Sequence, residues 1–311
     1  MEYLPIRVST LRGDQKIDFD AFLKINDKFI LYLRHGDSFE GERLGRLKSK
    51  KVRKMFILPE DESNYRKYLT RNIDIAYDAN SPASIANRSA IVQGDQQSHA
   101  EAVMENPADE QIYGDAKASS LKFVEFLTQS ESGFAQVLNI ENSDQNIAHH
   151  GVTVSTLSIA LAKRLGITDP KQTQLLSLGS ILHDFGHFNS GLAINRPLSA
   201  MSTAELEIYH KHPTAGVEQV RDKQHFDKTV LNIIAQHEEF VDGKGFPKGL
   251  TESKMDPLAV IVASCNALDR LTTFEGVPRK DAVKKLLISS IGRYPLNHIQ
   301  LLGDIMNQMK I

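Results

Sequence analysis

The histidines of this chain are clustered. Eight of its eleven histidines lie between His149 and His237, and two of them precede an acidic residue, in His183-Asp184 and His237-Glu238. Imidazole nitrogens and carboxylate oxygens together are the ligands that proteins use for iron, manganese and zinc. The segment therefore predicts a metal site.

The candidate ligands fall at the ends of predicted helices. The four positions are His150 at the start of one helix, His183-Asp184 at the end of a second, His212 at the end of a third, before Pro213, and His237-Glu238 at the end of a fourth. Helical bundles build metal sites from ligands on several facing helices. A carboxylate has two oxygens, so Asp184 is the natural bridge between two ions. Two bridged ions suit phosphoester hydrolysis.

The elements that must position these residues are mostly helices. From about residue 119 onward, apolar residues recur at the i, i+3, i+4 spacing, which predicts a bundle of helices. Residues 1–80 read as a small α/β domain, with strands at 29–33 and 52–58 and helices at 41–51 and 62–74. Residues 81–118 are polar and read as a linker that is partly helical. The predicted fold is mainly α.

The bulk composition is that of an ordinary globular protein. Apolar residues make up 41% of the 311 residues, and the net charge of −2 gives no support for bulk nucleic-acid binding. A single cysteine, Cys265, excludes an internal disulfide and suits the cytoplasm. The first residues lack the apolar core of a signal peptide, and no apolar run is long enough to span a bilayer.

Two stretches carry a family resemblance. His183-Asp184 with Gly186, and the run from His237 to Pro247 (HEEFVDGKGFP), resemble the two signatures of the HD-GYP phosphodiesterases, a branch of the HD metal-dependent phosphohydrolases. The resemblance covers about residues 140–290. It implies an all-helical metal-binding domain, a site for two or three metals, often iron or manganese, and hydrolysis of cyclic di-GMP to pGpG or GMP.

Carried over position by position, the resemblance implies three groups of residues. The metal ligands are His150, His183, Asp184, His212, His237, Glu238 and Asn266. The catalytic residues are Asp184, His187 and Lys248. The substrate-binding residues are Gly243, Gly245, Phe246 and Arg196, with Arg279 and Lys280 as more distant basic candidates. Two metals are expected, with iron favoured and manganese or zinc compatible.

The chain departs from the family pattern at several of these positions. The departures are Glu238 for the second histidine of HHE, His187 for a lysine, Phe246 for the tyrosine of GYP, Asn266 for an aspartate, and Asn146 for the glutamate of three-metal members. Asn146 favours two metals over three. If the helix ending at His183 continues, His187 lies one turn further on. A basic DRPYR-like stretch is also missing, because Phe274 and Glu275 lie there.

These departures leave two functions open. The first is a two-metal cyclic di-GMP phosphodiesterase, and the second is a binding module that keeps the metals but has lost turnover. The DGKGFP loop argues against other HD substrates such as nucleotides. The N-terminal domain is expected to bind a signalling partner or to shield the metal pocket, and the GFP loop is a second candidate partner surface.

Several other side chains are expected to be structural. His149 and His210 are predicted to be partly exposed and not ligands, and Cys265 is predicted to be inert core. The basic run 48–51 reads as a solvated helix end. Phe246 is expected either to stack on a guanine base or to fill the core of its own domain.

Overall fold

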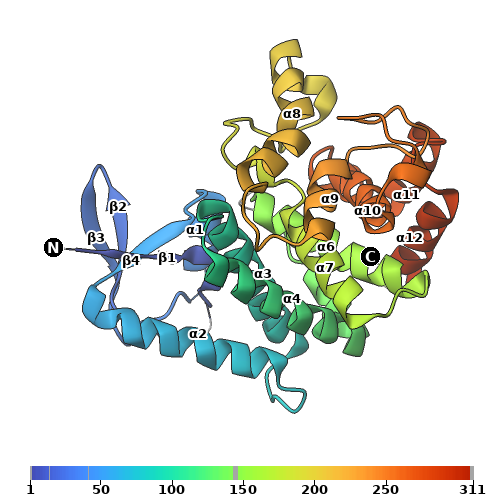
Figure 1. Ribbon diagram of the computed structural model, residues 1–311. Coiled ribbons are helices and arrows are strands. Elements are labelled where there is room, and N and C mark those ends of the chain that lie inside the picture. The colour runs from blue at the N-terminus through green and yellow to red at the C-terminus, as the bar shows by residue number, and fades with distance from the viewer. Residues whose placement is uncertain (1, 14, 41, 143–145, 309–311) are drawn as a thin grey trace.

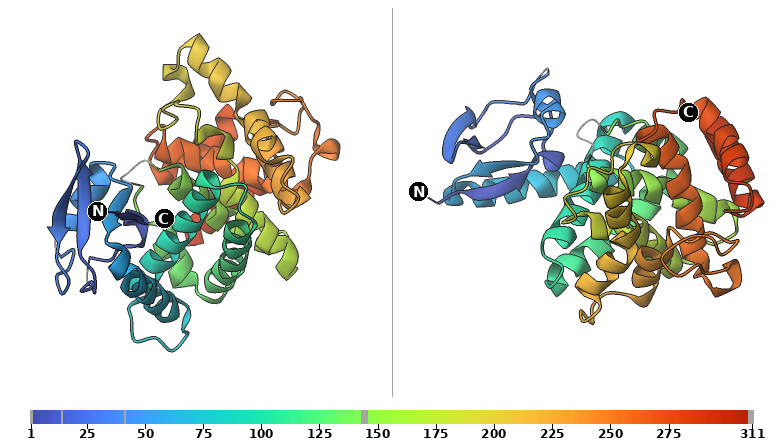
Figure 2. Two further views of the ribbon diagram at one scale, coloured as in Figure 1. Left: turned by 60° about the vertical axis from the view of Figure 1, so that its left-hand side comes forward. Right: turned by 90° about the horizontal axis from the view of Figure 1, so that it is seen from above.

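The computed structural model describes residues 2–13, 15–40, 42–142 and 146–308. A small sheet with one long helix occupies one end of the molecule, and a larger bundle of helices forms the rest (Figure 1). The right-hand view of Figure 2 shows the sheet standing apart from the bundle. No helix in the described ranges is long and apolar enough to cross a membrane.

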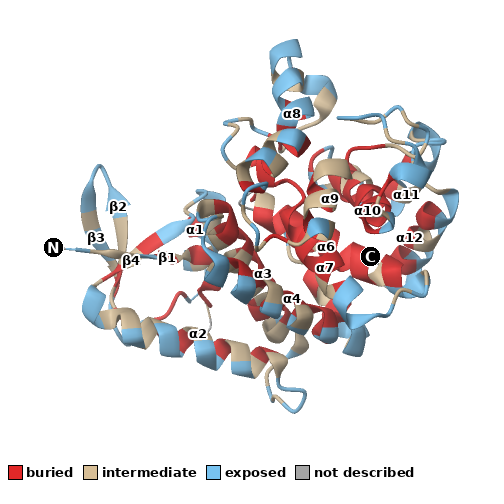
Figure 3. Cartoon of the chain, viewed as in Figure 1, coloured by how far each residue is buried: buried red, intermediate tan, exposed pale blue. Residues whose placement is uncertain are grey.

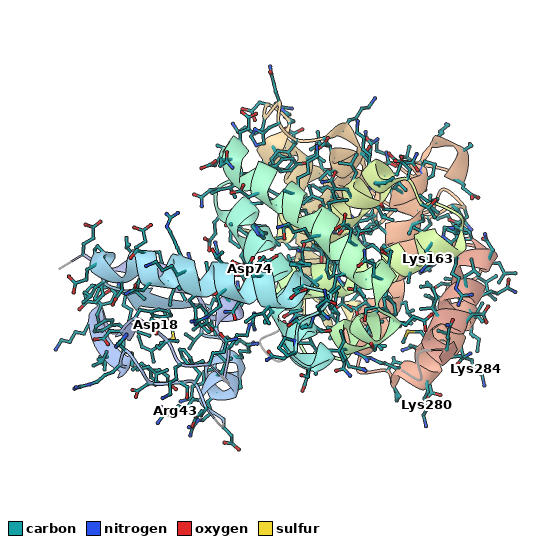
Figure 4. The ribbon with its side chains drawn as sticks, turned by 90° about the horizontal axis from the view of Figure 1, so that it is seen from below. Asp18, Arg43, Asp74, Lys163, Lys280 and Lys284 are labelled. Atoms are coloured by element: carbon teal, nitrogen blue, oxygen red, sulfur yellow. The ribbon has the colours of Figure 1, made fainter. Side chains whose placement is uncertain are left out.

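The N-terminal unit is a four-stranded antiparallel sheet with strand order β1-β4-β2-β3. Its elements are β1 (Leu4–Arg7), η1 (Val8–Thr10), β2 (Ala21–Ile25), β3 (Lys28–Leu33), α1 (Arg43–Ser49), β4 (Lys54–Ile57), η2 (Pro59–Asp61) and α2 (Glu62–Tyr77). Figure 4 shows α2 running along this unit and reaching the bundle near Asp74. An apolar cluster of its own, with Phe19, Phe39 and Met55 fully buried, holds the unit together. The small α/β fold expected here is confirmed.

The rest of the chain is helical, as predicted. The elements are α3 (Ile85–Glu105), α4 (Glu110–Gln129), α5 (Glu131–Leu138), α6 (Ile147–Arg164), α7 (Pro170–Leu182), η3 (Phe185–His187), η4 (Leu198–Ala200), α8 (Thr203–Val220), α9 (Lys228–Gln236), η5 (Glu252–Lys254), α10 (Pro257–Thr273), α11 (Arg279–Ser289) and α12 (Leu296–Gln308). Figure 3 shows the buried residues concentrated where α6, α7, α9 and α10 meet. A single apolar cluster runs through these helices.

The segment 81–118 differs from the partly helical linker expected there. It forms α3 and the start of α4, and Ile91, Val92 and Val103 on α3 belong to the core of the bundle. The segment reads as a linker because α3 buries polar side chains too. These find hydrogen-bond partners inside the bundle: Gln93 donates to Gln97 on the same helix at 3.0 Å, and Gln96 donates to the Ser119 hydroxyl of α4 at 2.7 Å. The exact boundaries of the domains remain a prediction.

Candidate metal centre

Four helices bring the clustered histidines to one buried point. His150 lies in the first turn of α6, His183 and His237 follow the last residues of α7 and α9, and His212 comes from α8. All four side chains, and that of Asp184, are at most 2% exposed. The five strongest sequence candidates are therefore brought together.

Asp184 lies at the centre of the cluster and divides the histidines into two pairs. Its Oδ2 atom is 3.7 Å from Nε2 of His150 and 3.6 Å from Nε2 of His183. Its Oδ1 atom is 3.4 Å from Nε2 of His212 and 3.5 Å from Nε2 of His237. Each carboxylate oxygen thus faces the Nε2 atoms of two imidazoles, which is the arrangement that a bridging carboxylate needs.

Backbone carbonyls fix the orientation of three rings. In each case Nδ1 meets the carbonyl oxygen three residues earlier: Ser180 for His183 at 2.7 Å, Tyr209 for His212 at 2.5 Å, and Ile234 for His237 at 3.0 Å. A carbonyl oxygen only accepts, so Nδ1 carries the proton in each ring. The Nε2 lone pairs therefore all point towards Asp184, in the tautomer that binds metal.

The position of His212 corrects the sequence prediction. Helix α8 does not end at His212 but continues through Pro213 to Val220. Proline has no N–H, so Pro213 cannot donate to the Tyr209 carbonyl four residues earlier. That carbonyl is left for Nδ1 of His212. The proline therefore orients the ligand within a continuous helix.

The cluster has the electronic character of a cation site. The Nε2 atoms of His212 and His237 are 2.8 Å apart, although both rings keep their proton on Nδ1. Two lone pairs at that distance repel unless a positive charge lies beside them. Nε2 of His183 and Oδ2 of Asp184 are buried without a hydrogen-bond partner among the described residues. The donor set therefore fits divalent metal.

The titration behaviour agrees with that conclusion. Burial lowers the pKa of His183 to about 3 despite the nearby Asp184 carboxylate, so the ring is neutral. Burial alone would raise the pKa of Asp184, but His183, His212 and His237 hold it well below its usual value. A neutral His183 ring beside an ionised Asp184 carboxylate matches the protonation states that metal binding requires. The pKa of His237 is raised despite its burial, because the Asp184 and Glu238 carboxylates favour the protonated ring.

The ring of His150 is held by a side chain. Its Nδ1 atom is 2.6 Å from Oδ2 of Asp269, and its Nε2 atom is 3.0 Å from Oδ1 of Asn266. The Asp269 carboxylate accepts the Nδ1 proton, which turns the Nε2 lone pair towards the amide oxygen. The sequence showed that Asp269 was present, but it gave no indication of this positioning role.

Glu238 is buried at the edge of the cluster. Its Oε1 atom accepts a hydrogen bond from the Tyr209 hydroxyl at 2.5 Å and lies 3.5 Å from Nδ2 of Asn266. The guanidinium of Arg270 lies 5.1 Å from the centroids of the Tyr209 and Phe274 rings. Sequence reasoning missed Tyr209 and Arg270. An arginine within the apolar stretch of α10 was the available signal, because a buried charge requires partners.

His187 lies beside the cluster, but not by continuation of α7. The helix ends at Leu182, and the chain turns through η3, so that the His187 ring stacks on His212 with centroids 3.8 Å apart. Burial and the neighbouring His212 lower the pKa of His187 to about 2, so the ring is neutral. Neither ring nitrogen has a hydrogen-bond partner in the described part of the chain.

The glycine-rich loop after α9 is held by one carboxylate. The two oxygens of Glu239 accept the backbone N–H groups of Lys248 at 2.7 Å and Leu250 at 2.8 Å. A Cβ on Gly245 would lie 2.2 Å from the nitrogen of Phe240, and Gly243 has a φ of 77°. Both positions therefore require glycine. The Glu239 hydrogen bonds and the two glycines therefore fix the conformation of this loop.

The loop brings Phe246 towards the metal centre. Its half-buried ring lies 4.6 Å from that of His210 and 6.3 Å from that of His212, centroid to centroid. The Lys248 side chain, by contrast, is exposed.

The basic residues predicted to bind substrate include Arg196 and, more distantly, Lys280. Arg196 donates to the carbonyls of Ala193 and Ala200 and pairs with Glu205, the capping-box residue of α8. Figure 4 shows Lys280 on α11, far from the N-terminal unit. Arg196 is therefore already engaged in shaping the loop before α8.

The remaining candidates are mostly as expected. Cys265 is buried and unpaired, and burial raises the pKa of its thiol to about 12. His210 is exposed. The exposure predicted for His149 is wrong: the ring is 4% exposed and contacts the carbonyl of Ile140 at 3.1 Å.

Known proteins share this fold and its signatures. The HD domain family model matches residues 135–289. Cyclic di-GMP phosphodiesterase PA4108 of Pseudomonas aeruginosa is 28% identical over 137 residues, covering 44% of this chain and 33% of that protein. Cyclic di-GMP phosphodiesterase PdeB of Borreliella burgdorferi is 26% identical over 174 residues, covering 50% of this chain and 45% of that protein. The chain thus spans less than half the length of these two relatives.

One solved structure matches along the whole chain. It is Bd1817, a HDG"Y"P protein from Bdellovibrio bacteriovorus, with 58% identity and a TM-score of 0.94, covering 98% of this chain and 100% of that one. The likeness extends through the N-terminal unit as well as the bundle. This chain belongs to the HD-domain family, and within it to the HD-GYP proteins.

Proposed function

We propose that this protein is a metal-dependent phosphodiesterase that hydrolyses cyclic di-GMP. The observation that carries the proposal is the division of four imidazoles into two pairs by the two oxygens of Asp184. That division supports two metal positions. The relatives that carry the name cyclic di-GMP phosphodiesterase support the substrate.

The proposed ligands are those that surround Asp184. They are His150, His183, Asp184, His212 and His237, with Glu238 and Asn266 completing the set. Divalent cations bound there supply Lewis acidity for the hydrolysis of a phosphodiester. Imidazole, carboxylate and amide donors suit iron, which we favour, as well as manganese or zinc.

The other residues of the proposed site orient the substrate. His187 donates an N–H to a phosphate oxygen, and Lys248 adds positive charge from the loop. Gly243 and Gly245 allow close approach of the backbone, and the Phe246 ring stacks on a base. Arg196 holds the loop before α8 in place at the edge of this site.

The test is metal content and turnover on the same sample of purified full chain. We expect two equivalents of metal and hydrolysis of cyclic di-GMP, followed by chromatography of the products. Asp184→Asn keeps the shape of the side chain but removes its charge, and it should lower both kcat and the amount of bound metal. Absence of bound metal after anaerobic loading with iron or manganese would refute the proposal.

A second candidate function is a cyclic di-GMP sensor with little or no turnover. Two observations favour it: the ring of His187 is neutral where the family has a charged lysine, and Asn266 offers a neutral amide where the family has an aspartate. Two equivalents of metal with ligand binding but without hydrolysis would support this candidate. The N-terminal unit and the GFP loop are then the proposed surfaces for a signalling partner.

A further inference from the structure

A pocket of about 250 Å³ lies between the N-terminal unit and the bundle. Its N-terminal side is formed by Lys51 and Arg53, and its other side by Ile147, residues 187–188 and residues 191–195. Lys51 and Arg53 lie in the segment between α1 and β4.

Ion pairs and a close packing contact hold the two sides of this pocket together. Arg7 of β1 and Lys54 of β4 both pair with Glu105 of α3, at 2.7 and 2.8 Å. A Cβ on Gly94 of α3 would lie 2.2 Å from the guanidinium of Arg12, so the chain after β1 packs directly on the helix. The two cations therefore come from a unit with a fixed position.

On the bundle side, the pocket is lined by a buried group that lacks a partner. His187 is 5% exposed, and neither of its ring nitrogens has a hydrogen-bond partner among the described residues. A neutral imidazole has one N–H donor and one acceptor, and leaving both unpaired is unfavourable. Because the His187 ring also stacks on His212, the pocket is one ring away from the metal centre.

The charge and size of the pocket indicate what it binds. Two side chains bring positive charge, and none of the described lining residues is acidic. Lys51 has a φ of 57°, which lies in the left-handed region that favours glycine. Pockets for whole drug-sized ligands run to about 300–1,000 Å³. This one is smaller, and it suits one phosphate with its sugar.

We propose that this pocket binds the second phosphate of a cyclic dinucleotide, the one that is not cleaved at the metal centre. The family has a lysine at the position of His187, and in this chain Lys51 and Arg53 supply the positive charge instead. The N-terminal unit is then part of the substrate site. The identity of the ligand rests on the proposed function. The binding of a phosphate group between the two units does not require turnover.

The experiment compares two variants of the full chain. The test variant combines Lys51→Gly, which relieves the backbone while removing the charge, with Arg53→Gln. The matched control is Lys50→Gln, because Lys50 belongs to the same basic run but lines a different pocket. Calorimetry would measure the binding of cyclic di-GMP, and separately of inorganic phosphate, to chelator-treated protein. KM and kcat would then be measured on the metal-loaded protein.

We expect the test variant to raise the Kd and the KM for cyclic di-GMP about tenfold, with kcat unchanged, because exposed ion pairs contribute modestly. The effect should shrink at high salt, where the charges are screened. Equal Kd values for the wild type, test variant and control would overturn the inference, and so would an effect limited to inorganic phosphate. If the wild type binds cyclic di-GMP without hydrolysing it, and the test variant binds it more weakly than the wild type, the pocket is upheld. That result would refute only the proposal that the protein is a phosphodiesterase.

Discussion

Gly151 lies where α6 crosses α7, one residue after the candidate ligand His150. A Cβ at this position would be 2.2 Å from the carbonyl oxygen of Ile181, more than 1 Å short of ordinary van der Waals contact. The neighbour is backbone and belongs to the last turn of α7, just before His183. We predict that Gly151→Ala forces the two helices apart and with them the two histidines.

The magnitude follows from a comparison with Gly114. Both glycines lie inside helices, but a Cβ on Gly114 would meet nothing within 4 Å. Alanine gains about 1 kcal/mol of helix propensity at either position. Only Gly151→Ala also pays for overpacking, which costs about 1–3 kcal/mol. The difference between the two variants therefore isolates the steric cost.

Urea unfolding of metal-free protein would measure this difference. We expect Gly114→Ala to be about 1 kcal/mol more stable than wild type, and Gly151→Ala to be about 1–3 kcal/mol less stable than Gly114→Ala. Metal affinity should fall about 10–100-fold in Gly151→Ala alone, as for other changes that misplace ligands. If Gly151→Ala matched Gly114→Ala in stability and wild type in metal content, the helix-crossing argument would be refuted.

Three further predictions follow. Pro213→Ala restores an N–H that competes with His212 for the Tyr209 carbonyl, so metal affinity measured by competition with a chelator should fall about 10–100-fold while the helix is retained; an unchanged affinity contradicts the role of the proline. Glu239→Gln replaces one accepting oxygen with a donor, so hydrogen exchange in the glycine-rich loop should accelerate without global unfolding; unchanged protection contradicts the anchor. Burial lowers the pKa of His298 to about 4, so between about pH 6.5 and 4 the unfolded chain binds more protons than the folded one, and the free energy of unfolding falls as the pH falls. In urea unfolding, His298→Gln should show a weaker dependence of the free energy of unfolding on pH over this range. The same dependence in the variant and the wild type would contradict this role of His298.

The sequence predicted the fold class because its periodicities are strong. The apolar spacing of the later helices and the β-rich runs at 29–33 and 52–58 match helices and strands in the structure. Helix α3 could not be read in the same way. Its buried face carries glutamines and a glutamate that pair with one another, and composition alone does not distinguish such a face from a solvated linker.

The sequence was sufficient to predict the candidate metal ligands, but not the residues that orient their side chains. Histidines and Asp184 can be placed by motif, and the structure brings them together. The residues that orient them act through contacts far apart in the chain, as Asp269 does with His150 over 119 positions. Pro213 misled the prediction because proline disfavours a helix interior, whereas here α8 continues through it to Val220. Arg270 has no motif at all.

The anchoring of three ligand rings on main-chain oxygens has a consequence for how the sequence can drift. Ser180, Tyr209 and Ile234 contribute to ring orientation through atoms that every amino acid possesses. Substitutions there leave those anchors intact so long as the helix geometry survives. Two rings depend on a particular residue as well: the ring of His150 on the Asp269 carboxylate, and the ring of His212 on Pro213, which leaves the Tyr209 carbonyl without a backbone donor. Substitutions in descendants of this protein are therefore expected to disturb ring orientation at His150 and His212 more readily than at His183 and His237.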